Sequence, residues 1–236
     1  MTEKPKAQKL AVVIPAGGVG TRFGGRLPKQ FIRLSRAPIL TQTVAHFTRH
    51  PAIVAIIVAA PEIHVERTRR ALAGVARRAP VTVVQGGGMR QDSVWLALQA
   101  VPATADIVIV HDAARCLVEP ADASAVLAAA RVTGAALPVL PASDTVKWLD
   151  GDRVERTLER ARVGLAQTPQ AFRIEVLREA LEKAERDGVE GTDCASLVER
   201  LGVEVRTSRG RAGNFKVTHP DDLLRAEALL AAREGG

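Results

Sequence analysis

The sequence is poor in residue types that mark several classes of protein. There is no tyrosine, and aromatic residues make up only 3% of the 236 residues, which leaves few rings for stacking on nucleic-acid bases. Two cysteines, Cys116 and Cys194, form neither a disulfide framework nor a zinc site. The longest apolar run, Ile53–Ala60, is about eight residues long, whereas a membrane helix needs about 20. We therefore expect a cytoplasmic protein with reduced thiols and no membrane contact.

Acidic residues are absent between Lys4 and Pro61, although the same stretch carries nine lysines and arginines. Over the whole chain, 33 Lys and Arg against 26 Asp and Glu give a net charge of +7. A segment with charge of one sign should attract an anion. An arginine- and alanine-rich composition could explain the total charge, but it explains the missing acids less well. A nucleic-acid-binding protein is the weaker alternative.

Apolar strands alternate with helix-length segments along most of the chain. Strands are predicted over Leu10–Ile14, Ile53–Ala60, Val81–Val84, Asp106–Val110, Ala135–Leu140 and Val203–Thr207. Helices are predicted over Pro38–His50, Pro61–Arg78, Arg90–Ala100, Ala121–Arg131, Ile174–Gly188 and Asp221–Arg233, with Val94, Leu96, Ala97 and Ala100 as core-facing candidates. This alternation predicts a doubly wound, Rossmann-like α/β fold with a mostly parallel sheet. Since there is no repeat and no low-complexity linker, we expect one domain over residues 1–236.

The alternation is interrupted after Pro141 by a hairpin signal. Two short segments, Thr145–Leu149 and Arg153–Leu158, flank Asp150-Gly151, and such a dipeptide favours a tight β-turn. We expect residues 142–160 to form an inserted β-hairpin arm that contacts a second subunit. An exposed Trp148 on this arm would fit such a contact.

The first predicted strand runs into a glycine-rich loop, Pro15–Gly25, whose backbone N–H groups can approach an anion. The loop lacks the Lys-Ser/Thr of a Walker A motif. It also fails the dinucleotide pattern, because Phe23 stands at the third glycine position and the next acid is Glu62. Two cations around such a loop, Arg22 and Lys29, suit a triphosphate whose charge rises during transfer. The alternative is that both are ordinary surface cations.

Six further strings follow the loop and Pro28-Lys29-Gln30 in a fixed order. They are Gly86-Gly87-Gly88-Met89-Arg90-Gln91-Asp92-Ser93-Val94, Val110-His111-Asp112-Ala113-Ala114-Arg115, Asp144-Thr145-Val146-Lys147, Thr168-Pro169-Gln170-Ala171-Phe172, Thr192-Asp193-Cys194-Ala195-Ser196 and Asn214-Phe215-Lys216-Val217-Thr218. In order and spacing they resemble the 2-C-methyl-D-erythritol 4-phosphate cytidylyltransferases, which are sugar-phosphate nucleotidyltransferases of the non-mevalonate isoprenoid pathway. The resemblance covers roughly Leu10 to Leu230.

The resemblance implies a nucleotide-diphospho-sugar transferase type of fold and a defined reaction. CTP and methylerythritol 4-phosphate would give 4-diphosphocytidyl-methylerythritol and pyrophosphate, by in-line attack of the substrate phosphate on the α-phosphate of CTP. It implies Mg²⁺ as cofactor and a homodimer with shared active sites. Without a covalent intermediate, the protein's contribution is positioning and charge stabilisation.

The resemblance also implies roles for individual residues. The catalytic cations would be Arg22, Lys29 and Lys216. The CTP site would comprise Ala16, Gly17, Gly18, Gly20, Gly87, Gly88, Arg90, Ser93, Asp112 and Ala113. The acceptor site would comprise Arg115, Thr145, Arg160, Thr168 and Thr192, with Thr145 and Arg160 entering the neighbouring subunit's site. Asp112 is the candidate Mg²⁺ ligand, directly or through water.

Several alternatives stay open for these residues. Asp112 could be a helix cap, Arg160 a surface charge and Thr192 a helix N-cap. Cys116 and Cys194 stand where the family commonly has proline and a second acid, and packing is their simplest role. A cytidylyltransferase for another polyol phosphate, such as ribitol 5-phosphate, is the nearest alternative function, and a basic nucleotide- or RNA-binding protein is the more distant one.

Overall fold

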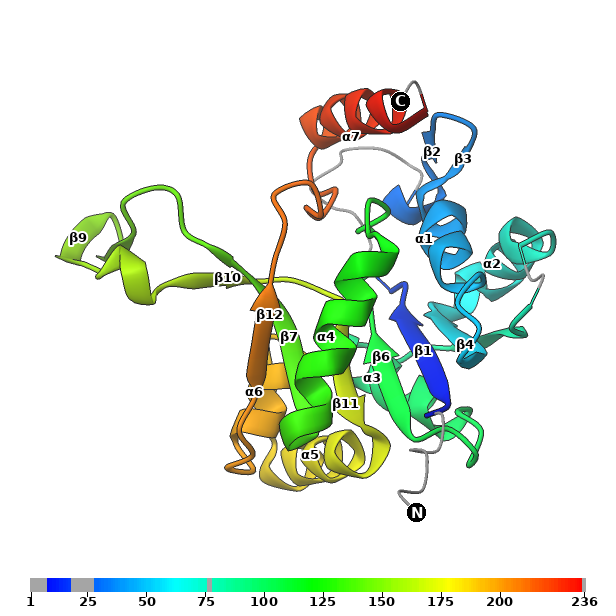
Figure 1. The fold of residues 1–236 in the computed structure, drawn as a ribbon, viewed down its shortest axis with the longest axis horizontal. Coiled ribbons are helices and arrows are strands. Elements are labelled where there is room, and N and C mark those ends of the chain that lie inside the picture. Colours follow the sequence, from blue (N-terminus) through cyan, green and yellow to red (C-terminus); the bar gives the residue numbers. More distant parts are fainter. Residues whose placement is uncertain (1–7, 18–27, 76–77, 235–236) are drawn as a thin grey trace, which may run out of the picture.

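The computed structural model describes residues 8–17, 28–75 and 78–234, and the chain forms a twisted central sheet with helices on both faces (Figure 1). The sheet has eight strands in the order β10-β7-β11-β6-β1-β4-β5, with β12 also paired to β7. The strands are β1 (Leu10–Pro15), β4 (Ile53–Ala60), β5 (Val81–Gln85), β6 (Ile107–Val110), β7 (Ala135–Pro141), β10 (Gly164–Ala166), β11 (Gln170–Arg173) and β12 (Arg206–Arg209).

The sheet is parallel in the part predicted from the alternation. Strands β6, β1, β4 and β5 are mutually parallel, and β12 runs parallel to β7. Strand β11 is antiparallel to both β6 and β7, and β10 is antiparallel to β7. The prediction of a mostly parallel, doubly wound sheet is therefore confirmed, with an antiparallel insertion between the two parallel groups.

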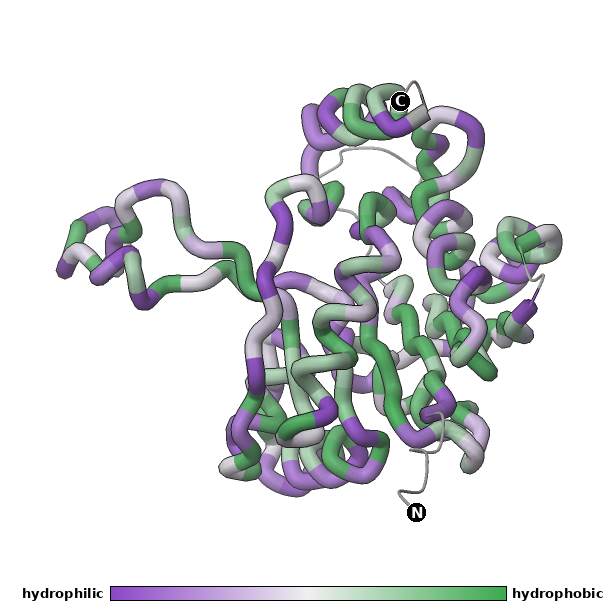
Figure 2. The backbone as a smooth tube through the Cα atoms, viewed as in Figure 1, coloured by the Kyte–Doolittle hydropathy of each residue, from purple (hydrophilic) through white to green (hydrophobic). Residues whose placement is uncertain are grey.

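Helices cover the two faces of the sheet and bury its strands on both sides. Helices α1 (Ile39–Phe47), α2 (Val65–Leu72) and α4 (Pro120–Thr133) pack on one face. Helices α3 (Arg90–Gln99), α5 (Ile174–Asp187) and α6 (Cys194–Glu199) pack on the other. Along β1, Val12 and Ile14 contribute to the first core and Val13 to the second, because successive side chains of a strand point to opposite faces. This double burial explains the unbroken apolar runs of the central strands, visible in Figure 2.

A smaller apolar cluster joins the C-terminal helix α7 (Pro220–Glu234) to the body. Ala226 of α7 is fully buried with Leu34, Cys116, Leu117 and Val217. Leu34 belongs to a short hairpin of β2 (Arg33–Leu34) and β3 (Ala37–Pro38). This cluster fixes the segment around Val217 against the β2-β3 hairpin and α7. It therefore positions Lys216, the neighbouring residue.

Several local predictions were wrong. The segment predicted as the helix Pro61–Arg78 begins with a 3-10 turn, Glu62–His64, before α2, and residues 76–77 lie outside the described part of the chain. Of the core-facing candidates, Leu96 in α3 and Ala100 just after it are exposed, whereas Leu98 is fully buried. The last strand begins at Arg206 rather than Val203. Periodicity in a short amphipathic segment fixes which face is buried only to within one position, since a helix turns by about 100° per residue.

Several short elements were missed. Strands β10 and β11 and helix α6 carry too few residues for a periodic pattern. Their structure comes from pairing with β6 and β7 and, for α6, from an N-cap. The carboxylate of Asp193 accepts a hydrogen bond from Ser196 N at 2.8 Å, which satisfies a backbone donor at the start of the helix.

The predicted hairpin is present and extends away from the body (Figure 1). Strands β8 (Lys147–Asp150) and β9 (Arg153–Thr157) are antiparallel and form a separate two-stranded sheet. Gly151 in the turn has a φ of +59°, a conformation that glycine adopts at little cost. Trp148, Leu149 and Val154 are each more than half exposed. Exposed apolar side chains grouped on one projection are typical of a contact surface.

Candidate active site

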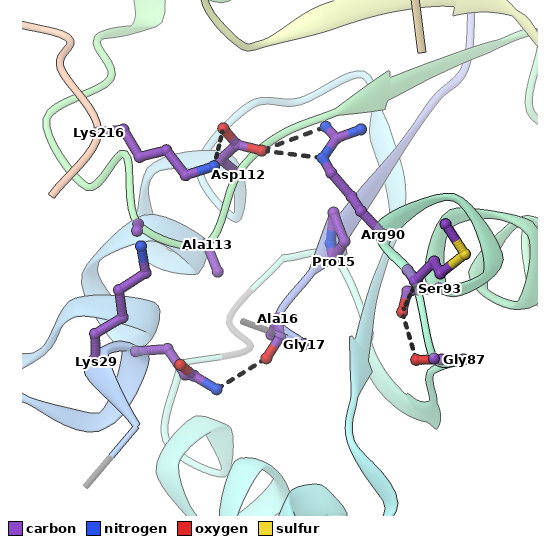
Figure 3. Close-up of a pocket in the computed structure, with 14 residues that line it drawn as sticks. Pro15, Ala16, Gly17, Lys29, Gly87, Arg90, Ser93, Asp112, Ala113 and Lys216 are labelled. Atoms are coloured by element: carbon purple, nitrogen blue, oxygen red, sulfur yellow. Dashed lines mark hydrogen bonds and ion pairs between the residues drawn. The ribbon is translucent and has the colours of Figure 1, made fainter. Parts of the chain in front are cut away.

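A pocket lies at the carboxyl ends of β1 and β6, where ligands bind in open α/β sheets. It encloses about 250 Å³ and receives residues from widely separated parts of the chain (Figure 3). Its lining comprises Pro15, Ala16, Gly17, Lys29, Gln30, Gly87, Gly88, Met89, Arg90, Ser93, Asp112, Ala113, Ala114 and Lys216. The motifs that carry Lys29, Arg90, Asp112 and Lys216 therefore meet with the end of β1 at this pocket.

Most of the catalytic and CTP-site residues predicted from the sequence line this pocket. They are Ala16, Gly17, Lys29, Gly87, Gly88, Arg90, Ser93, Asp112, Ala113 and Lys216. The predicted Gly18, Gly20 and Arg22 lie outside the described residues. The predictions missed Pro15, Gln30, Met89 and Ala114 as lining residues. All four residues belong to motifs quoted in the sequence analysis. The motifs therefore indicated their position, but no role was predicted for them.

The carboxylate of Asp112 is the electrostatic centre of the pocket. Lys216 and Arg90 approach it from opposite sides (Figure 3). Asp112 Oδ1 lies 3.3 Å from Arg90 Nη2, and Oδ2 lies 3.3 Å from Lys216 Nζ and 3.4 Å from Arg115 Nε. Three cations from three distant segments thus share one carboxylate.

This arrangement keeps Asp112 ionised. Burial alone would raise the pKa of Asp112, but the charges of Arg90, Lys216 and Arg115 lower it well below its usual range. The neighbouring cations outnumber the anion, so the site keeps a net positive charge. That balance favours a polyanionic ligand.

Helix α3 begins at the pocket with a glycine-rich turn. The Asp92 carboxylate accepts a hydrogen bond from Met89 N at 3.1 Å, and Ser93 Oγ donates to Met89 O at 3.0 Å. A Cβ on Gly87 would lie 2.2 Å from Asp92 Cβ, so this close packing requires glycine. The segment thereby brings the backbone of Gly87 and Gly88 to the pocket wall.

A short 3-10 turn, Lys29–Phe31, supplies the opposite wall. Lys29 Nζ donates to Val217 O at 3.1 Å, so Lys29 lies beside the segment that carries Lys216. Gln30 is buried, and its amide donates to Ala16 O at 2.8 Å. The turn therefore ties the end of β1 to the lysine that lines the pocket.

Arg115 and Thr168 lie behind Asp112 rather than on the pocket surface. Besides Asp112, Arg115 donates through Nη1 to Asn214 O at 2.8 Å. Thr168 is only 4% exposed, and its hydroxyl accepts a hydrogen bond from Asp112 N at 3.1 Å. Both side chains are engaged within the protein in this structure.

The remaining predicted acceptor residues lie apart from the pocket of their own chain. Thr145 and Arg160 are exposed at the base of the arm, and Arg160 Nη1 donates to Ser143 O at 2.8 Å. Thr192 is exposed, just before Asp193, the N-cap residue of α6. The structure of one chain therefore does not bring these three side chains to Lys29 and Lys216.

The two cysteines are buried packing residues. Burial raises the pKa of Cys116 to about 11 and also raises that of Cys194. Cys194 Sγ accepts a hydrogen bond from Arg90 Nη1 at 3.5 Å. Both thiols are therefore protonated at neutral pH, as expected for packing residues.

Among the described residues, no three or more His, Cys, Asp or Glu side chains are grouped so that they could hold a metal ion. No helix among them is long and apolar enough to cross a membrane.

Comparison with known proteins agrees with this geometry. The sequence model of IspD, 2-C-methyl-D-erythritol 4-phosphate cytidylyltransferase, matches residues 10–232. The cytidylyltransferase of Symbiobacterium thermophilum is 46% identical over 222 residues, covering 94% of this chain and 92% of the relative. A bifunctional IspD/IspF enzyme of Rhodopseudomonas palustris is 40% identical over 97% of this chain, which spans 58% of that relative.

A solved structure supports the same assignment. The crystal structure of the Thermus thermophilus cytidylyltransferase matches with a TM-score of 0.76 and 37% identity, covering 94% of this chain and 98% of the other. The family match extends over nearly the whole chain and includes every motif that lines the pocket. The chain belongs to the 2-C-methyl-D-erythritol 4-phosphate cytidylyltransferase family.

Proposed function

We propose that this pocket transfers the cytidylyl group of CTP to 2-C-methyl-D-erythritol 4-phosphate, forming 4-diphosphocytidyl-2-C-methyl-D-erythritol and pyrophosphate. The chain is a cytidylyltransferase of the non-mevalonate isoprenoid pathway by its family. The observation that carries the assignment to this pocket is the convergence of Lys29, Lys216 and Arg90 on one cavity at the strand ends. We expect it to act in the cytoplasm, since both substrates are charged phosphates.

The described residues divide into a base side and a phosphate side. The backbone of Gly87 and Gly88, with Ser93 and Arg90, would hold the cytidine base, and Asp112 and Ala113 would contact its ribose. Ala16 and Gly17 at the end of β1 would bind the triphosphate, together with the family-implied Gly18 and Gly20. Gly87 and Gly88 have no side chains to cover their main-chain groups at the pocket wall, so those groups would recognise the base.

Three cations would act on the reacting phosphates. Lys29 and Lys216, with the family-implied Arg22, would stabilise the negative charge that grows on the α-phosphate as the substrate phosphate attacks in line. The two described lysines lie on adjoining walls, because Lys29 Nζ donates to Val217 O. They therefore act from fixed positions and need little rearrangement as the charge develops.

The pocket fits a magnesium ion held mainly by phosphate. Asp112 supplies the only carboxylate among the described residues that line it, and Mg²⁺ is commonly bound by one or two carboxylates together with substrate phosphates. We propose that Asp112 holds the ion directly or through water. When bound, the ion would neutralise charge on the CTP phosphates.

A decisive experiment measures pyrophosphate release from CTP in the presence of Mg²⁺. It compares methylerythritol 4-phosphate, ribitol 5-phosphate and no acceptor. Release only with methylerythritol 4-phosphate is the expected result. Release only with ribitol 5-phosphate would support the assignment of the CTP site and contradict methylerythritol 4-phosphate as the acceptor. If a folded protein released no pyrophosphate with either acceptor, the nucleotide- or RNA-binding alternative would be favoured. A steep loss of nucleic-acid affinity with rising salt would then support that alternative.

We further propose that the chain forms one cytidylyltransferase domain over residues 1–236, with the arm at residues 142–160 joining two copies in a homodimer. The exposed Trp148, Leu149 and Val154 of the arm supply an apolar contact surface. Thr145 and Arg160 then reach the acceptor site of the partner, where a phosphate would be met by a guanidinium and a hydroxyl. Arg115, Thr168 and Thr192 would complete the acceptor site.

A mixing experiment tests this sharing of sites. Lys29→Ala and Arg160→Ala homodimers should each be nearly inactive. After the two are dissociated and reassociated at equal amounts, random pairing makes about half the dimers mixed, and one of their two sites is intact, so about one quarter of wild-type activity should return. If Arg160 serves its own subunit, the mixture will show only the mean activity of the two variants.

A further inference from the structure

Lys216 lies on a segment that is neither helix nor strand. Residues 210–217, the Lys216 segment, follow β12 and lead towards α7 (Figure 1). The lysine lines the pocket, with Nζ 3.3 Å from Asp112 Oδ2. Because irregular segments are more mobile than helices and strands, the position of Lys216 depends on the contacts that hold this segment at its two ends.

One end of the Lys216 segment is fixed just after the lysine. Val217 N donates a hydrogen bond to Ala114 O at 2.8 Å. The side chain of Val217 is fully buried in the apolar cluster that contains Leu34 and Ala226. A single attachment point would leave the preceding residues free to pivot about it. A second attachment point is therefore needed to fix the lysine.

The backbone of Arg211 forms part of the second attachment. Arg211 N donates to Gln167 Oε1 at 3.1 Å, and Gln167 Nε2 donates back to Arg211 O at 2.9 Å. Gln167 is buried, so water competes little for these two hydrogen bonds. Beside them, Gly210 N donates to Val139 O at 2.8 Å. The beginning of the segment is thus joined to the central sheet.

The side chain of Arg211 joins the same point to helix α4. Its Nε and Nη2 donate to the two carboxylate oxygens of Asp122 at 2.7 and 2.8 Å. Its Nη1 donates to Glu119 Oε1 at 2.7 Å. Asp122 is buried in the first turn of α4. A bidentate pair fixes orientation as well as distance, so Arg211 holds the segment against a rigid helix.

One tight turn connects Arg211 to the lysine. Asn214 N donates to Arg211 O at 3.0 Å, and Asn214 lies two residues before Lys216. Arg211 is not among the residues that line the pocket. Its effect on the reaction must therefore pass through the segment to which it belongs.

We propose that Arg211 is a positioning residue for cytidylyl transfer: its attachment to Asp122 fixes the Lys216 segment, so that the Lys216 amine meets the transferring phosphate from a constant position. A cation that is already in place stabilises growing charge without rearrangement. This inference rests on the proposed function of the pocket. It goes beyond that function because Arg211 lies outside both the pocket and the sequence motifs.

Four enzymes test whether Arg211 acts through the lysine: wild type, Arg211→Gln, Lys216→Ala and the double variant. Arg211→Gln should lower kcat about 10- to 100-fold, since a small misplacement of a catalytic group can have an effect of this size. KM for CTP should change less than about threefold. In the Lys216→Ala background, Arg211→Gln should lower kcat by less than about threefold, because the group that it positions is already gone.

The same four rates can overturn the proposal. Equal reductions of kcat by Arg211→Gln in the two backgrounds would show that Arg211 acts independently of Lys216. A kcat of Arg211→Gln close to that of wild type would show that Arg211 has no role in the reaction. Absence of turnover in the wild type would instead contradict the proposed function of the pocket, and the exchange measurement below would then decide the role of Arg211.

Arg233→Gln is the matched control. Arg233 Nη2 donates to Glu119 Oε1 at 2.6 Å and to Leu117 O at 3.2 Å. The substitution therefore removes a guanidinium from the same group of charges but leaves the Lys216 segment attached to Asp122. Its kcat should stay within about twofold of wild type. A loss as large as that of Arg211→Gln would point to a general effect on folding and contradict the proposal.

Hydrogen exchange measures the order of the segment without turnover. The amides of residues 212–217 should exchange faster in Arg211→Gln than in wild type, and at the wild-type rate in Arg233→Gln. Unchanged exchange in a folded Arg211→Gln protein would contradict the proposal. If Arg211→Gln does not fold, Arg211→Lys takes its place in every assay. It keeps the charge but cannot bond both carboxylate oxygens of Asp122 in the same geometry, so smaller changes in the same directions are expected.

Discussion

Replacement of Lys29 by alanine is expected to lower kcat about 10²- to 10³-fold, the usual cost of removing one charged contact that acts in the transition state. Lys29 lines the pocket, and its amine is held 3.1 Å from Val217 O beside the segment carrying Lys216. Negative charge on the transferring phosphate grows as the reaction proceeds. The contact therefore strengthens in the transition state, and KM for CTP should change much less than kcat.

Lys183→Ala is the matched control for this measurement. Lys183 lies on α5 and pairs with Asp187 at the surface, with Nζ 2.9 Å from Oδ2, so its loss should leave steady-state rates unchanged. Lys29→Arg keeps a positive charge and should retain more activity than Lys29→Ala. Equal rates for Lys29→Ala and wild type, or an effect confined to KM, would show that Lys29 does not act on the transition state.

Replacement of Asp112 by asparagine is expected to reduce kcat by about 100-fold or more and also to destabilise the fold. The substitution keeps the shape of the side chain but leaves Arg90, Arg115 and Lys216 facing one another without an anion. Removing one partner from a buried charge cluster costs about 3–5 kcal/mol when all partners are buried. Lys216 is 42% exposed, so we expect a smaller loss of about 2 kcal/mol in the free energy of unfolding.

The loss of stability should depend on pH in one direction. The folded-state pKa of Asp112 lies well below its ordinary value, because three cations outweigh the effect of burial. The carboxylate therefore stabilises the fold fully above about pH 4, the ordinary pKa of aspartate, and progressively less as the pH falls towards the folded-state pKa. Urea unfolding of wild type and Asp112→Asn between pH 7 and the acid limit of folding measures this difference.

Asp187→Asn provides the comparison for Asp112→Asn. Asp187 also pairs with two cations, Lys183 and Arg200, but water screens these exposed pairs, so little stability should be lost. A difference for Asp112→Asn that stayed constant or grew as the pH fell would contradict the ionised carboxylate. Normal turnover of a folded Asp112→Asn enzyme would remove Asp112 from the functional site.

The sequence by itself determined the parts of this protein that depend on local or periodic signals. Unbroken β-branched runs such as Ile53–Ala60 indicated strands covered on both faces, and the structure has that strand with the same bounds. The Asp150-Gly151 pair located the arm, because a tight turn needs a residue that tolerates positive φ. The ordered motifs indicated the family, and they placed Lys29, Arg90, Asp112 and Lys216 among the site residues before their arrangement was known.

Only the tertiary structure decided how those residues act together. The sharing of one carboxylate by Arg90, Arg115 and Lys216 joins segments about 20 to 100 residues apart, and no spacing along a chain predicts contacts formed by the folding of a sheet. The antiparallel insertion of β11 depends on pairing partners on both sides rather than on its own four residues. The Thr168 hydroxyl lies 3.0 Å from His111 Nδ1 and accepts a hydrogen bond from Asp112 N, and the local sequence of neither segment predicts this contact.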